Sequence, residues 1–280
     1  MDVILPPELE REIFEIAATE DKRTIPALLR VCHRAHNWIE PLLYRTLIIS
    51  DYDDAELVAL RSKSLEFKKR AVHHVFIEDN PNTRAHVHKL ISQLSGIQTL
   101  ALNGYASDEL LLAIYNLLPR RLNVCAPLYN PSEWVRSTFA CSCFFLVTHL
   151  EIFHDPMPSM EDYDWDDWSV LASLPSLTHL CLERHSVAEL LPLFFEKCTQ
   201  LAVLIVAFWN PSPETEAAEF VENVRVKDPR MVVMVFDAQF FKEDWQRGVR
   251  SGDDFWARAD GFLAKKRDGK IQNSVYLVED

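Results

Sequence analysis

Glycine is scarce in this chain, at six of 280 residues, about 2% where soluble proteins average about 7%. Glycine-rich loops let a backbone approach a phosphate group closely, and neither G-x-G-x-x-G nor G-x-x-x-x-G-K-S/T occurs in the sequence. The scarcity therefore argues against a nucleotide- or dinucleotide-binding enzyme built on such a loop.

Basic residues are outnumbered as well. Lysine and arginine total 29 against 42 aspartates and glutamates, which gives a formal net charge of −13. Binding to nucleic acid depends on a concentrated basic surface that neutralises phosphates. We therefore expect no nucleic-acid partner, whereas the acidic surplus is compatible with a basic protein partner.

Apolar runs long enough to span a membrane are missing. The longest run, Leu201–Trp209, is far shorter than the ~20 residues that a transmembrane helix needs. Met1–Leu5 leads directly into two prolines and a charged amphipathic stretch, which is unlike a secretory signal peptide. We expect no membrane partner and a location in the cytoplasm or nucleus.

The six cysteines form no recognisable framework. Most lie inside apolar runs such as Leu180-Cys181-Leu182, as reduced cysteines of an intracellular protein do. Cys141 and Cys143 are one close pair, but no second pair follows at the spacing of a zinc site. We expect neither a metal nor another cofactor.

A short phrase, apolar-x-apolar, recurs along most of the chain and predicts a series of short strands. Successive phrases begin 22 to 30 residues apart, and two of them match further, as V-T-H-L-E-I and L-T-H-L-C-L. The phrases begin at Leu47, Val75, Leu100, Leu122, Leu150, Leu180, Leu204 and Val233.

Segments with helical periodicity separate these phrases. They span residues 83–94, 107–118, 131–139, 165–174, 186–195 and 213–226. Strand and helix alternating at this repeat length indicate an α/β leucine-rich-repeat-like solenoid, or horseshoe. A doubly wound α/β sheet also alternates strands and helices, but it is less favoured because its glycine-rich first turn is missing.

The first 48 residues differ from the repeats and hold amphipathic helical segments, the second over Ile25–Ile39, which Pro41 is expected to end. Leu5-Pro6-Pro7-Glu8-Leu9 with Ile13-Phe14, and Leu28-Leu29-Arg30-Val31-Cys32 with Trp38-Ile39, resemble an F-box. The whole chain resembles the F-box-like proteins with degenerate leucine-rich repeats that mushroom-forming fungi encode in large numbers. On this division, residues 1–48 are an F-box-like helical segment and residues 49–280 a degenerate repeat domain with a C-terminal cap at about 253–280.

The resemblance implies a non-catalytic subunit that recruits a protein substrate to a ubiquitin ligase. The N-terminal helices would bind a Skp-type adaptor of a cullin–RING ligase by burying a few large apolar side chains. The residues that match the motif and would bind the adaptor are Leu5, Pro6, Leu9, Ile13, Phe14, Leu28, Leu29, Val31 and Trp38. Two alternatives stay open: these side chains cap the end of the repeats, or the chain is a free-standing interaction scaffold without ligase association.

Side chains that alternate with the buried positions of each phrase are expected to face the concave side of the sheet in three rows. Together with the acidic-aromatic segment His154–Trp168, these rows are the predicted contact surface for an unknown protein substrate. The candidate substrate-binding residues are His74, Phe76, Glu151, Phe153, His179, Glu183, Tyr163 and Trp165. The histidines of one row lie on different strands, so ordinary surface histidines are favoured over a metal site.

No residue stands out as catalytic. Both the G-x-S-x-G nucleophile elbow and H-E-x-x-H are absent from the sequence. A hydrolase without a recognisable motif is therefore the least favoured alternative, and the chain is predicted not to be an enzyme.

The C-terminal residues are predicted to end the repeats. Phe255, Ala259 and Phe262 follow two aspartates at helical spacing, and Asn273–Val278 alternates like a strand. We expect this helix and strand to cover the open end of the repeat core.

Overall fold

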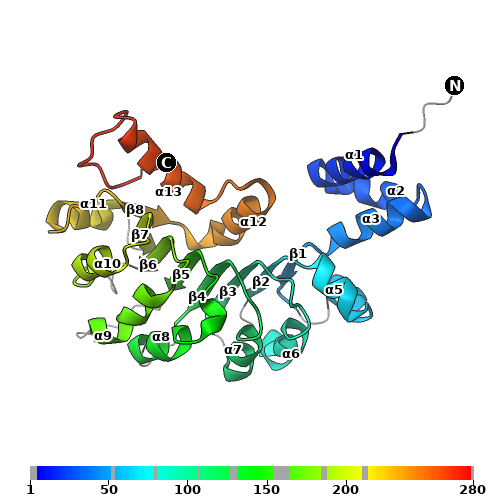
Figure 1. Ribbon diagram of the computed structural model, residues 1–280, viewed down its shortest axis with the longest axis horizontal. Coiled ribbons are helices and arrows are strands. Elements are labelled where there is room, and N and C mark those ends of the chain that lie inside the picture. Colours follow the sequence, from blue (N-terminus) through cyan, green and yellow to red (C-terminus); the bar gives the residue numbers. More distant parts are fainter. Residues whose placement is uncertain are drawn as a thin grey trace.

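The computed structural model has an α/β fold with one eight-stranded, entirely parallel sheet (Figure 1). It describes residues 5–51, 54–78, 81–105, 107–126, 131–153, 164–183, 188–209 and 214–278. The strands are β1 (Thr46–Ile49), β2 (His74–Glu78), β3 (Thr99–Tyr105), β4 (Arg121–Cys125), β5 (His149–Phe153), β6 (His179–Glu183), β7 (Val203–Trp209) and β8 (Met231–Phe236).

The strands lie side by side in chain order, and the repeated phrases align in their register. Leu122 of β4 pairs with Leu150 of β5, and Leu150 pairs with Leu180 of β6. The last phrase is displaced, because β8 begins two residues before Val233, and it is Met231 that pairs with Leu204. A displacement of two residues keeps every side chain on its expected face.

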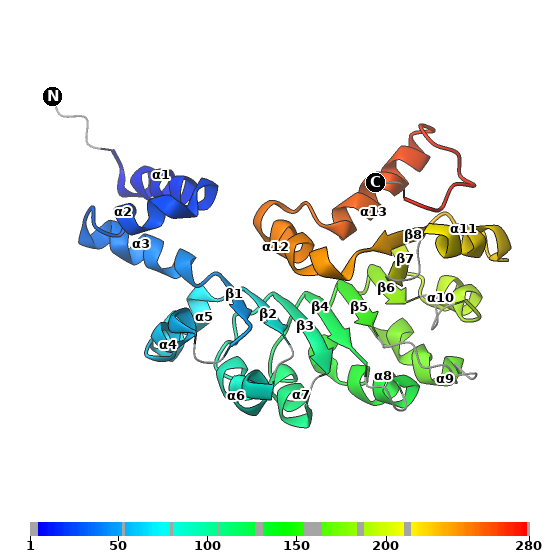
Figure 2. The ribbon, with the colours of Figure 1, turned by 180° about the vertical axis from the view of Figure 1, so that it is seen from behind.

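The helices between strands lie on one face of the sheet (Figures 1 and 2). They are α4 (Ala55–Arg61), α5 (Leu65–Ala71), α6 (Pro81–Ile91), α7 (Asp108–Ile114), α8 (Pro131–Phe139), α9 (Trp165–Trp168), α10 (Leu191–Lys197) and α11 (Glu214–Asn223). Short 3-10 turns, η2 (Ser142–Phe144) and η3 (Ser169–Ser173), follow α8 and α9. The sequence did not predict α4 and α5.

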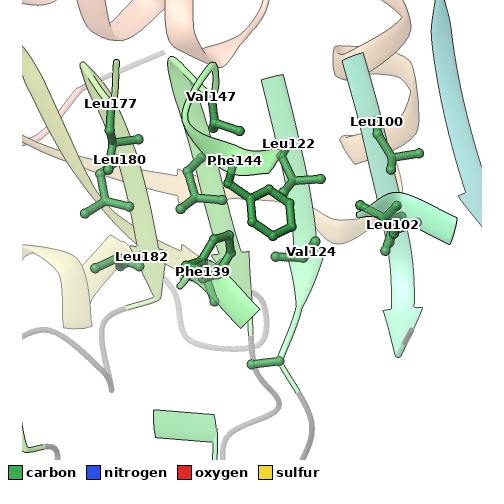
Figure 3. Close-up of a cluster of buried hydrophobic side chains, with 14 of the residues drawn as sticks. Leu100, Leu102, Leu122, Val124, Phe139, Phe144, Val147, Leu177, Leu180 and Leu182 are labelled. Carbon is green, nitrogen blue, oxygen red and sulfur yellow. The ribbon is translucent and has the colours of Figure 1, made fainter. Parts of the chain in front are cut away.

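The main hydrophobic core lies between the sheet and these helices. The two apolar residues of each phrase point into it because they are two positions apart and therefore share one face. Figure 3 shows Leu100, Leu122 and Leu180 of three strands in one cluster with Phe139 and Phe144. The apolar side chains of the repeated phrases thus form the face of the sheet that the helices cover.

Two further helices, α12 (Phe241–Ser251) and α13 (Phe255–Arg267), lie across the opposite face of the sheet (Figures 1 and 2). A second apolar cluster forms there, in which Phe76, Cys181 and Ile205 of the sheet are fully buried beside Trp245 and Trp256. Both faces of the sheet are therefore covered. We refer to α12 and α13 together as the C-terminal cover.

The residues after α13 return to the edge of the sheet. Val233 of β8 donates its N–H to Tyr276 O (2.8 Å) and accepts from the Val278 N–H (3.0 Å), which makes a single bridge with Leu277. The expected final strand is thus shortened to one bridge. It covers the edge of the last strand at Val233, where unpaired backbone groups could otherwise pair with another chain.

The N-terminal helices stand beyond β1 at the other end of the sheet (Figures 1 and 2). They are α1 (Pro7–Glu20), the turn η1 (Lys22–Thr24), α2 (Ile25–Leu28) and α3 (His33–Leu43). They share a small core around Ala18, Ile25 and Ile39. No described helix is long and apolar enough to cross a membrane.

The prediction of one helix over Ile25–Ile39 is wrong. Cys32 has extended backbone (φ −164°, ψ 165°), and its Sγ accepts a hydrogen bond from the Ala35 N–H at 3.4 Å. It therefore begins a separate helix, α3. Pro41 does not end that helix but lies inside it, near its C-terminal end. Because proline has no backbone N–H, the helix lacks one hydrogen bond at this position.

Candidate functional site

The residues matched to the F-box divide into an inward and an outward set. Phe14, Leu28, Leu29 and Trp38 are half-buried and pack on the small core of the N-terminal helices. The exposed ones among the nine are Leu5, Pro6, Leu9, Ile13 and Val31. The structure therefore gives the first set a role in holding these helices together and leaves the second set accessible.

Helix α1 carries an exposed apolar stripe. Leu9, Ile13 and Ile16 are 47%, 54% and 50% exposed, and their spacing of four and three places them on one face of the helix. Val31, after α2, adds a side chain that is 58% exposed. Ile16 is not among the residues matched to the F-box and was therefore not predicted to bind the adaptor.

Ion pairs border this stripe. Arg11 pairs with Glu15 at 2.6 Å along α1, and Arg34 of α3 pairs with Glu10. The Arg34 guanidinium also lies 5.3 Å from the Trp38 ring centre. Of these contacts, only the pair of Arg34 and Glu10 joins α3 to α1. The small core around Ala18, Ile25 and Ile39 holds the helices together beneath the exposed stripe.

The substrate-binding residues that were predicted to lie in rows do share one face of the sheet, as the strand register shows. The C-terminal cover, however, lies on that face. Phe76 is fully buried against Phe241 (6.0 Å between ring centres) and Trp245 (5.3 Å). Phe153 contacts Phe241 at 5.5 Å. Binding of a substrate by these residues stays a prediction, and it requires the cover to move.

Glu151 is the most deeply buried acidic residue among those described, at 2% exposure. Its carboxylate accepts a hydrogen bond from Asn123 Nδ2 at 2.6 Å. Burial raises the pKa of Glu151 to about 8, and the nearby carboxylates of Asp244 and Asp254 also raise it, whereas the bond from Asn123 lowers it. The carboxyl is therefore largely protonated at neutral pH.

A cavity of about 30 Å³ adjoins Glu151 where α13 begins. Asn123, Arg121 and Asp254 line it, and Asn123 Oδ1 has no hydrogen-bond partner in the described part of the chain. The space is large enough for one water molecule but not for an organic ligand. This cavity is therefore too small to hold a small-molecule substrate.

Two histidines of neighbouring strands, His149 of β5 and His179 of β6, stack on each other. The rings of His149 and His179 are 4.0 Å apart and nearly parallel, and both contact the Trp256 ring edge-on. Burial lowers the pKa of His149 to about 2, assisted by the proximity of His179 and Arg121. His149 is therefore neutral at physiological pH, and no group of three metal-ligating side chains exists among the described residues.

Charged pairs join the cover to the sheet. Lys242 of α12 contacts Glu78 of β2 at 2.6 Å, and Asp254 contacts Arg121 of β4 at 2.8 Å. In a third contact, His179 Nε2 lies 3.3 Å from Asp260 Oδ1 of α13. Burial lowers the pKa of His179, so at neutral pH this contact is a hydrogen bond to a largely neutral ring. One member of each contact has a side chain that is more than one-third exposed, namely Lys242, Arg121 and Asp260. Each contact therefore contributes modestly to stability.

The remaining candidate residues are spread over the molecule. His74 and His179 are half-buried at the sheet face, and Glu183 is buried there. Trp165 lies on the other side of the sheet, where its ring packs edge-on against Phe194 of α10 at 5.2 Å. Tyr163 and the rest of the acidic-aromatic segment up to it lie outside the described residues. Trp165 is therefore not brought together with the rows.

Sequence reasoning missed α12 altogether. The signal was present, since Phe241, Trp245 and Val249 recur at spacings of four, the pattern of an amphipathic helix.

Comparison of the chain with protein-family models, curated proteins and solved structures gives no match.

Proposed function

We propose that this chain is a non-catalytic substrate-recognition subunit that binds a Skp-type adaptor of a cullin–RING ubiquitin ligase through its N-terminal helices. The observation that carries the proposal is the exposed apolar stripe on α1, which includes Leu9 and Ile13 of the F-box-like motif. Its other apolar side chains, Phe14 and Ala18, pack inward. The stripe is thus not needed to hold the helices together and is available to a partner.

The proposal includes the fold class, a degenerate leucine-rich-repeat-like solenoid. Its support is the strand order, which follows the chain from β1 to β8 without reversal. A doubly wound sheet reverses its order at a switch point, where its ligand site lies. A solenoid instead stacks each repeat on its neighbours, as the strands do here, and serves protein recognition more often than small-molecule chemistry.

The apolar stripe is large enough to matter for binding. Full burial of a leucine or isoleucine is worth about 1.5–3 kcal/mol. Leu9, Ile13 and Ile16 are each about half exposed, so their burial by a partner is worth about 2–4 kcal/mol in total. That free energy corresponds to roughly 30- to 700-fold in affinity.

The test is direct binding of the full chain to a purified Skp-type adaptor. We expect the variant Leu9→Ser/Ile13→Ser/Ile16→Ser to bind at least about 30-fold more weakly. A matched control replaces two exposed leucines next to the repeats, Leu112→Ser/Leu118→Ser, which are 62% and 55% exposed. The control is expected to bind as the unchanged chain does.

Thermal unfolding of both variants establishes that they fold. If the folded stripe variant binds as tightly as the control, the stripe is not the adaptor site. If the unchanged chain itself does not bind the adaptor, the ligase proposal is wrong, and the free-standing interaction scaffold becomes the better description.

A protein substrate is proposed to bind the repeat domain, and a basic substrate would suit the net charge of −13. The sheet face that carries His74, Phe76 and Glu151 is covered by α12 and α13. Recognition by that face therefore requires the cover to be displaced. High salt screens only the charged pairs between cover and sheet, so displacement mainly has to separate the apolar cluster that they share.

A further inference from the structure

Two cysteines lie in contact on the helix-covered side of the sheet. Cys141 and Cys143 are in the segment that connects α8 to β5, and their Sγ atoms are 2.8 Å apart. A disulfide bond is about 2.05 Å long, so the two sulfurs need to approach by less than an ångström to bond. All six cysteines of the chain are free thiols in this structure.

The two thiols differ in accessibility. Cys143 is 6% exposed and belongs to the main core, whereas Cys141 is only partly buried at the start of η2. A reagent in solution therefore meets Cys141 first. It reaches Cys143 by way of Cys141, which is the arrangement of an attacking thiol and a resolving thiol.

We propose that Cys141 and Cys143 are a redox-modification site that takes a small disulfide of the glutathione class as its oxidant. The Cys141 thiolate attacks one sulfur of the small disulfide, whose S–S bond breaks and releases one thiolate. Cys143 Sγ then attacks Cys141 Sγ, which forms the intramolecular bond and releases the second thiolate. Two protein thiols are oxidised by two electrons, the small disulfide is reduced to two thiols, and two protons move to the leaving thiolates.

The surroundings of the pair favour a reversible bond. Phe144, the next residue, packs against Phe139 (5.1 Å) and Tyr115 (5.9 Å), which holds this segment in place (Figure 3 labels Phe139 and Phe144). The stabilisation that a disulfide gives grows with the length of the loop it closes, and one residue separates these cysteines. The bond adds little to the stability of the fold and is therefore readily reduced.

A metal is a weaker explanation for the pair. A structural zinc needs four ligands, and no group of three histidine, cysteine, aspartate or glutamate side chains that could hold a metal exists in the described part of the chain. The proposal is independent of ligase association, because both thiols are remote from the exposed stripe on α1.

The test uses the full chain after complete reduction. The protein is incubated with oxidised glutathione, remaining thiols are alkylated under denaturing conditions, and intact mass and peptide maps are measured. We expect two of the six cysteines, Cys141 and Cys143, to escape alkylation without retaining glutathione, and dithiothreitol to restore both. The proposal is overturned if both remain alkylatable while the exposed Cys32 takes up glutathione.

Single substitutions separate the two roles. Cys143→Ser is expected to accumulate glutathione on Cys141, because no resolving thiol is left, and Cys141→Ser to leave Cys143 unmodified. Cys32→Ser, which removes an exposed thiol elsewhere, is the matched control and is expected to form the bond between Cys141 and Cys143 as the unchanged chain does. Glutathione retained on Cys143 in the Cys141→Ser variant would contradict the assigned order of attack.

The pH dependence of the second step gives a further check. Burial raises the pKa of Cys143 to about 12, and the hydrogen bond with Cys141 adds to this. Its thiolate fraction therefore rises about tenfold for each pH unit below that value. Release of the second glutathione is expected to accelerate about tenfold from pH 7 to pH 8, and a flat profile would show that Cys143 is not the resolving thiol.

Discussion

Glu151 shows how a single residue couples the stability of this fold to pH. Its carboxyl lies beneath the C-terminal cover, and burial followed by the effect of Asp244 and Asp254 raises its pKa to about 8. An unfolded glutamate has a pKa of about 4.3. Between these values the folded state binds more protons than the unfolded state, so stability falls as the pH rises.

The groups that surround this carboxyl come from several elements. Asn123 and Arg121 lie on β4, Cys181 on β6, and Asp244 and Asp254 on the cover. Burial, with the effect of the Glu151 carboxyl next to it, also raises the pKa of Cys181 well above its ordinary value. Both groups are therefore largely neutral at pH 7. Their neutrality suits this interior, because Arg121 is the only cation among the described residues that line the cavity.

We predict that Glu151→Gln removes this pH dependence. The glutamine oxygen can still accept from Asn123 Nδ2 but carries no charge at any pH. As the pH rises from 5 to 9, the unchanged chain is expected to lose stability because of Glu151, whereas the variant does not. The stability of the variant relative to the unchanged chain therefore rises over this range, by about 1.4 kcal/mol for each unit by which folding raises the pKa of Glu151. Urea unfolding at pH 5, 7 and 9 measures the difference.

Glu133→Gln on α8, an exposed position, is the matched control. It is expected to keep the pH dependence of the unchanged chain. Parallel stability curves for the Glu151 variant and this control would contradict the account of Glu151.

Among the elements, α13 depends on the residue before it. Asp254 Oδ1 accepts from the Ala257 N–H at 3.0 Å, which caps the helix, and Oδ2 accepts from Arg121 of β4 at 2.8 Å. A Cβ on Gly248 of α12 would lie 2.5 Å from Asp254 Oδ2, so only glycine allows the two helices this approach. One carboxylate therefore joins α12, α13 and the sheet.

We predict that Asp254→Ala costs more stability than Asp254→Asn. The alanine loses the cap, worth about 1 kcal/mol, and also leaves Arg121 without its hydrogen-bonded partner, for a total of about 2 kcal/mol. The asparagine keeps a capping oxygen and loses only the charge. Thermal unfolding and hydrogen exchange of residues 255–267 measure the two effects, and equal losses would show that the cap is unimportant.

At the scale of the whole molecule, the two ends of the chain differ in how they pack against the sheet. The N-terminal helices stand beyond β1, while the C-terminal cover lies on the sheet and its tail pairs with β8 (Figure 1). Apolar side chains of α13 such as Phe255, Trp256 and Leu263 are buried against the sheet face. The C-terminal end is therefore part of the fold, whereas the N-terminal end presents an unfilled apolar stripe.

Truncation after Gly252 tests this difference. Removal of α13 and the tail is expected to expose apolar residues of β7 and β8, lower the melting temperature and increase binding of a hydrophobic dye. The proposed binding of an adaptor by α1 is expected to survive the truncation if the shortened chain stays in solution. A monomeric truncated chain with an unchanged melting temperature would contradict the role of α13 in the fold.

The sequence by itself determined the strands and their register. The alternation of side chains in a strand makes apolar-x-apolar a reliable sign of one buried face, and seven phrases at similar spacing, from Leu47 to Leu204, align in the sheet as predicted. The helix α13 was also predicted, because its aspartate start and apolar spacing are local features. The periodicity of apolar residues within one segment can be recognised without knowledge of contacts between distant segments.

Only the tertiary structure decided what covers the second face of the sheet. The contact between Arg121 and Asp254 joins residues 133 positions apart, and no local pattern specifies such a pairing. Whether Glu151 faces solvent or lies buried depends on that packing, since its strand alternation is the same in both cases. The placement of α12 and α13 thus determines the burial, and with it the pKa, of residues that the sequence alone assigned to an open surface.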